Sequence, residues 1–148
     1  MIHWLALFHP MVIHFPIALL AVALVLEYLG WLRPSWNLGS AVSWNLHLGF
    51  LGALVSVITG WLRAQTMGFE PDLKPALEIH RWLGVGTLAM ALLCVLLWWE
   101  TQKRASVIPW YRTILLVVVL IVGVTGHYGG TLVYGLDYFG EAFHTHGK

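Results

Sequence analysis

The sequence contains little charge and a single cysteine. Only 10% of its 148 residues are charged, and eight Lys and Arg residues against seven Asp and Glu residues give a net charge of +1. Because no basic stripe is present to neutralise phosphates, nucleic acid is excluded as a partner. Cys94 has no second cysteine for a disulfide, and the CxxCH segment that attaches c-type haem is absent. We interpret Cys94 as a small buried hydrophobic residue.

Apolar residues make up 59% of the chain, and they are concentrated in four continuous segments. These segments cover residues 11–31, 42–62, 77–99 and 108–127, and each is about as long as the roughly 20 residues that cross a bilayer as a helix. Continuous apolar segments indicate helices, since barrel strands would alternate. We therefore predict an all-α integral membrane protein: one domain over residues 1–148, a four-helix bundle with up-down-up-down topology, and a short tail over residues 128–148.

Four spans place both termini on the same side of the bilayer, which we call the terminal side. The two loops on the opposite side, residues 32–41 and 100–107, are short and carry Lys and Arg close to the span ends. Such loops favour the cytoplasm. We therefore expect the termini to lie outside the cytoplasm.

The chain has eight histidines, and three of them reach a similar depth. At about 1.5 Å per residue, His14, His80 and His127 all lie within roughly 7 Å of the terminal side. Ionisable side chains at such depth are costly, which indicates a functional role. The residues one turn deeper are all small, namely Ala18, Gly84 and Gly123. Small neighbours leave room for a flat macrocycle, and we predict one b-type haem near the terminal side.

The bundle geometry predicts which histidines bind the iron. Neighbouring helices lie about 8–10 Å apart, so diagonal helices are about 11–14 Å apart and have room for two imidazoles with an iron between them. The first and third spans are diagonal, so we expect His14 and His80 as axial ligands, with His127 as the alternative ligand or the partner of a propionate or quinone. We expect Pro16 to bend the first turns, aiming His14 inward and leaving His9 at the rim.

Several other polar residues have two interpretations. Arg81 could hold propionates together with Arg63 and Lys74, or anchor the helix at the membrane rim. His9 could pair with a propionate or be an ordinary interfacial histidine. His47 shares its depth with no other histidine. We expect it to hydrogen-bond to a neighbouring backbone group or to Ser43, and the alternative is a role in quinone or proton chemistry.

Four segments carry a family resemblance. They are "HPMVIHFPIALL" from His9, "GW" at residues 60–61, "HRWLG" at residues 80–84 and "TGHYGGTLVYGLDY" at residues 125–138. Together they resemble the bacterial membrane family called domain of unknown function 2231, in the form found beside or fused to c-type cytochrome domains. The resemblance implies a four-span module that binds haem and serves respiratory electron flow, and it points to His9, His14, His80 and His127.

Glycines follow the last of these histidines. Gly129 and Gly130 permit positive φ and close backbone approach, so their N–H groups could cap the helix end or meet a ligand carboxylate, and we expect chiefly that they end the fourth helix. The only acidic residue well inside a span is Glu27. We expect it to reach water at the opposite interface.

The function expected from these features is electron transfer. The protein would pass electrons between membrane quinol and a c-type cytochrome or another redox subunit, in the inner membrane of a bacterium with its termini in the periplasm. No convincing acid–base pair is present, which favours an electron-transfer subunit over a stand-alone enzyme. Two alternatives are open: a non-catalytic accessory subunit of a larger respiratory or photosynthetic complex, or a copper or zinc site built from three imidazoles. A homo-oligomer is compatible with each of them.

Overall fold

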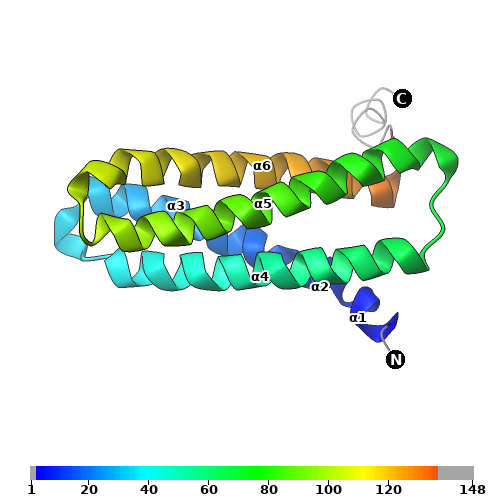
Figure 1. Cartoon of the computed structure of the whole chain (residues 1–148), viewed down its shortest axis with the longest axis horizontal. Helices are drawn as coiled ribbons and strands as arrows, with labels where there is room; N and C mark the ends of the chain where they lie inside the picture. The colour runs from blue at the N-terminus through cyan, green and yellow to red at the C-terminus, as the bar shows by residue number, and fades with distance from the viewer. Residues whose placement is uncertain (1–2, 137–148) are drawn as a thin grey trace, which may run out of the picture.

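The computed structural model describes residues 3–136 of the chain, and within this range it contains helices and no strands (Figure 1). The helices, in order, are α1 (His3–Leu7), α2 (His9–Val12), α3 (His14–Leu32), η1 (Pro34–Trp36), α4 (Gly39–Thr66), η2 (Pro71–Leu73), α5 (Lys74–Thr101), η3 (Ala105–Val107) and α6 (Ile108–Tyr134). Residues 137–148, the larger part of the expected tail, lie outside the described residues.

Four stretches of helix are long and apolar enough to cross a membrane. They are His9–Leu32, Gly39–Thr66, Pro71–Thr101 and Ala105–Tyr134. Many large apolar side chains on their outer surfaces are exposed, as lipid-facing residues are, and exposed tryptophans such as Trp82 and Trp110 lie near span ends. The predicted all-α, multi-pass membrane fold is confirmed.

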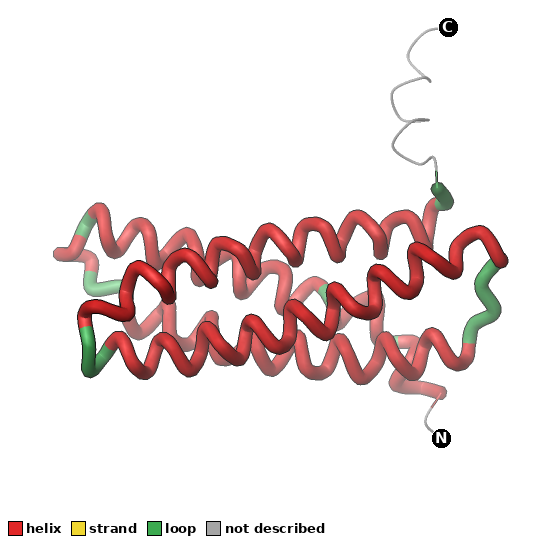
Figure 2. Tube along the Cα trace, turned by 45° about the horizontal axis from the view of Figure 1, so that its top comes forward, coloured by secondary structure: helices red, strands yellow, loops and turns green. Residues whose placement is uncertain are grey.

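The long helices form the expected four-helix bundle (Figure 2). Helix α3 packs against α4 and α6, and α5 also packs against α4 and α6, so that α3 and α5 are diagonal to each other. The long connection between α4 and α5 lies at the same end of the bundle as α1 and the last turns of α6 (Figure 1). This end is the terminal side that the even number of spans predicts.

The bundle core is apolar and closely packed. Its fully buried members include Leu20, Leu46, Leu115 and Cys94, and the largest of them is Tyr111. The burial of Cys94 agrees with its interpretation as a core residue. A glycine allows α3 to pack closely on α4, because a Cβ atom added to Gly49 would lie 2.9 Å from Leu20 Cδ2.

The first span is broken near its start. Pro10 lies in the first turn of α2, where its missing N–H is not needed. Helix α2 ends at Val12 and α3 begins at His14. Pro16 has no N–H to donate to the carbonyl of Val12, which accounts for a break at this point. The helix is interrupted where the bend was expected, while Ile13 itself keeps helical dihedral angles (φ −58°, ψ −27°).

The fourth helix is longer than predicted. It continues through Gly129 and Gly130 to Tyr134, and Gly135 follows with a φ of 94°. The expectation that Gly129 and Gly130 end this helix is wrong, because Gly135 adopts the positive φ at which helices terminate.

Substitution of two helical glycines tests the packing of α3 on α4. We expect Gly49→Ala to destabilise the protein by about 1–3 kcal/mol, because the new methyl group overpacks Leu20. Gly86→Ala is the matched control, because a Cβ there meets no atom within 4 Å; its stability should stay equal or rise by up to about 1 kcal/mol. Thermal unfolding in detergent micelles measures both, and equal effects would contradict this packing.

Candidate histidine site

His9, on α2, lies against α4. Its Nδ1 atom is 3.1 Å from Thr59 Oγ1. The hydroxyl of Thr59 donates its own hydrogen to the carbonyl of Val55 at 2.8 Å, which leaves the oxygen as an acceptor. We therefore assign the proton of the neutral His9 ring to Nδ1, which leaves a free lone pair on Nε2.

His80, on α5, is held in the same manner by α6. Its Nδ1 atom is 2.9 Å from the backbone oxygen of Thr125. A carbonyl oxygen only accepts hydrogen bonds, so Nδ1 must carry the proton. The Nε2 atom of His80 is consequently the unprotonated nitrogen of the neutral ring.

Both imidazoles rest on a glycine of the neighbouring helix. A Cβ atom added to Gly60 of α4 would lie 2.7 Å from His9 Cε1, and one added to Gly129 of α6 would lie 3.1 Å from His80 Cε1. Any larger residue would displace the rings. This contact gives a physical reason for the glycine inside α6 that was expected to end the helix.

The two rings share one region of the bundle. Helix α2 and the start of α5 lie at the terminal side (Figure 1), and His9 is within electrostatic range of His80 and Arg63. Each ring is held through Nδ1, and the backbone oxygen of Ser56 also lies within hydrogen-bonding reach of the His9 ring. A neutral imidazole with its Nδ1 proton fixed and its Nε2 lone pair free is the form that ligates metal ions.

The structure differs from the expected pairing of His14 with His80. The His14 side chain is exposed on the outer surface, and so is Ala18 one turn deeper. Residues five apart lie about 140° apart around a helix axis, so His9 lies toward α4 while His14, at the start of α3, is exposed. The expectation that the bend aims His14 inward and leaves His9 at the rim is therefore wrong.

His127 also has an exposed side chain, and its ring lies 5.5 Å from that of Tyr128. A Cβ added to Gly84 or Gly123 meets no atom within 4 Å, so neither glycine serves helix packing. In residues 3–136, no group of three or more His, Cys, Asp or Glu side chains is placed to hold a metal ion. The alternative of a three-imidazole copper or zinc site is therefore not supported.

Arg81 lies beside the histidines and contacts α4. Its guanidinium carbon is 3.8 Å from the centre of the Trp61 ring, a cation–π contact. Its Nε atom is buried and has no hydrogen-bond partner among the described residues. The "GW" segment thus provides Gly60 for His9 and Trp61 for Arg81.

Two polar residues lie away from this region. His47 bonds through Nδ1 to the Ser43 carbonyl at 2.7 Å and packs on Trp99, which confirms its expected structural role. Glu27 was expected to reach water, but its carboxylate is buried and accepts a hydrogen bond from Arg112 at 2.8 Å.

Comparison with known families gives one match. Residues 7–138 match the family described as "Predicted membrane protein (DUF2231)". The chain belongs to this family. The part that matches DUF2231 includes His9, His80 and both of their glycines. No curated protein and no solved structure matches the chain.

The histidine tautomers can be measured directly. We expect nitrogen NMR of metal-free protein labelled with ¹⁵N-histidine to show His9 and His80 with the proton on Nδ1. Thr59→Val removes the side-chain acceptor of His9 and leaves that of His80 in place. Because the lost hydrogen bond contributes about 1 kcal/mol, the ratio of the two His9 tautomers should change about fivefold. His80 serves as the internal control, since its carbonyl acceptor is unchanged. Protonation of His80 at Nε2 would contradict the assignment.

Proposed function

We propose that this protein is a membrane b-type haem protein with His9 and His80 as the axial ligands. The observation that carries the proposal is a pair of imidazoles on different helices, each with Nδ1 bonded to its neighbour and Nε2 free. This pair replaces the expected His14 and His80 pair. A bound haem supplies a one-electron redox centre.

The residues around the two rings suit this role. The Nδ1 hydrogen bonds fix the ring orientations and increase the basicity of Nε2. Gly60 and Gly129 allow the rings to lie directly on the adjacent helices. Arg81, whose buried Nε lacks a partner, and Arg63, close to His9, supply positive charge for the propionate carboxylates.

The position of the rings supports a direction of electron flow. His9 and the start of α5 lie at the terminal side, where an external protein can approach. We propose that electrons pass from membrane quinol to a c-type cytochrome or another redox subunit on this side. In this proposal the terminal side faces the periplasm and the bilayer is the bacterial inner membrane.

Single histidine variants test the ligand pair. We expect His9→Ala and His80→Ala each to reduce the haem-to-protein ratio at least about tenfold, since an axial bond is lost. His14→Ala is the matched control on the same span, and its ratio should equal that of the wild type. Haem content and reduced-minus-oxidised absorption spectra of the purified proteins give the result.

Two outcomes would overturn this proposal. Loss of haem in His14→Ala with full retention in His9→Ala would show that the outward-facing histidine is the ligand. A featureless spectrum from folded, metal-free wild-type protein would favour the accessory-subunit alternative instead.

A further inference from the structure

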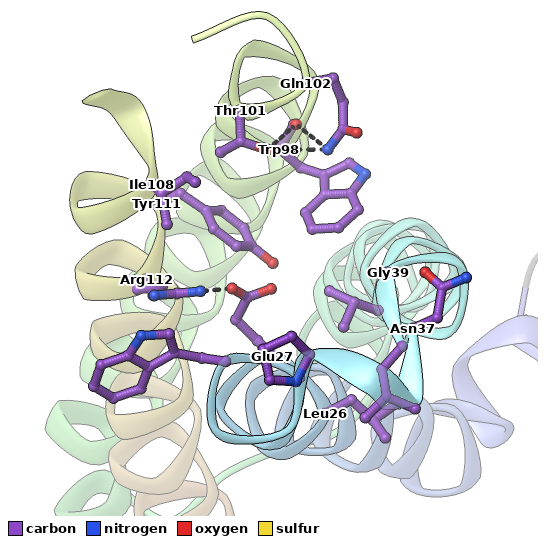
Figure 3. A pocket seen from close by; sticks show the side chains of 15 residues that line it. Leu26, Glu27, Asn37, Gly39, Trp98, Thr101, Gln102, Ile108, Tyr111 and Arg112 are labelled. Atoms are coloured by element: carbon purple, nitrogen blue, oxygen red, sulfur yellow. Dashed lines mark hydrogen bonds and ion pairs between the residues drawn. The ribbon is translucent and has the colours of Figure 1, made fainter. Parts of the chain in front are cut away.

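A second polar region lies at the end of the bundle opposite the histidines. There the ends of the four long helices surround a cavity of about 310 Å³ (Figure 3). Trp98, Leu26, Val42 and Ile108 contribute apolar and aromatic walls. The volume is near the lower end of the roughly 300–1,000 Å³ that small-molecule sites occupy.

A buried ion pair forms one wall of this cavity. Arg112 Nε donates to Glu27 Oε1 at 2.8 Å, and the two side chains are 23% and 10% exposed. The guanidinium carbon of Arg112 also lies 5.3 Å from the Trp31 ring centre. Because the two charges cancel, the cavity disfavours a charged ligand, whose own charge would stay uncompensated. A neutral ligand with polar atoms fits it best.

Tyr111 directs a hydroxyl group into the cavity. The residue is 1% exposed, and its ring packs 5.5 Å from that of Trp98. Figure 3 shows its hydroxyl pointing into the cavity above the Glu27 carboxylate, and this buried oxygen has no hydrogen-bond partner among the described residues. Burial of an unpaired hydroxyl is unfavourable, and an acceptor oxygen of a ligand would remove that penalty.

We propose that this cavity binds the head group of a lipid-soluble quinone, with a quinone carbonyl accepting a hydrogen bond from Tyr111. The aromatic and aliphatic walls suit the ring, the balanced charges suit its neutrality, and the site lies at span ends that a membrane-dissolved molecule can reach. The choice of a quinone rests on the proposed function, in which quinol is the electron donor. Within the described residues, Glu27 Oε2 makes no hydrogen bond and can accept one from the hydroxyl of the reduced form.

Quinone titration of the full-length protein in detergent micelles tests this site. The probe is a short-chain ubiquinone with one isoprenoid unit. Its binding is monitored by quenching of tryptophan fluorescence, since Trp98 and Trp31 line the cavity. We expect saturable quenching in the wild type and about 5–10-fold weaker binding in Tyr111→Phe. This variant should be at least as stable as the wild type, because the lost hydroxyl has no partner. Tyr28→Phe, outside the cavity lining, is the matched control and should bind like the wild type.

The results separate this site from the haem proposal. Absence of saturable quenching in folded wild-type protein, or equal affinity in Tyr111→Phe, would overturn the quinone site even where haem is present. Saturable quinone binding that depends on Tyr111, in protein without haem, would support the site and overturn only the haem proposal. A saturable response to short-chain phosphatidylglycerol and none to the quinone would overturn the inference in favour of a lipid head group.

Discussion

Close contact between an imidazole and a helix backbone is possible only where that helix carries glycine. Two histidines of this bundle depend on such a contact, His9 on Gly60 and His80 on Gly129. Each glycine brings a hydrogen-bond acceptor of the neighbouring helix within reach of the ring. The acceptor then holds the Nδ1 proton and leaves Nε2 free. The chemistry available at the terminal side follows from these two contacts.

Polar side chains inside the membrane-spanning helices indicate where function is located. Two polar regions lie at opposite ends of an apolar core that includes Leu20 and Leu115. At the terminal side the polar groups are imidazoles with free nitrogens, and at the opposite end they are an ion pair and an unpaired tyrosine hydroxyl. Burial of a polar group in an apolar core or in the bilayer costs free energy. The concentration of polar groups at the two ends is consistent with ligand binding at each.

Much of the fold was predictable from the sequence, because bilayer thickness and backbone hydrogen bonding restrict a chain this apolar to spanning helices. The sequence also predicted three finer features correctly, namely the diagonal arrangement of α3 and α5, the burial of Cys94 and the local hydrogen bond of His47. Depth along the helices also identified the correct end of the bundle for the histidines.

Rotation about a helix axis was not predictable in the same way. Whether His9 or His14 faces inward depends on how the start of the first span is rotated against α4, and His9 is the one that packs against Gly60. The bond between Glu27 and Arg112 joins residues 85 positions apart, which no local pattern indicates. Thr59 and Gly60 are adjacent in the sequence, and this combination of a hydroxyl and a glycine was the signal that could have identified the partner of His9.

The central claim is that two protein imidazoles ligate one haem iron through Nε2. Pulsed electron paramagnetic resonance of the ferric wild-type protein, with natural-abundance and with ¹⁵N-labelled histidine, tests this claim most directly. We expect a low-spin ferric signal with couplings from two histidine nitrogens. A high-spin signal, or coupling from only one histidine, would contradict it.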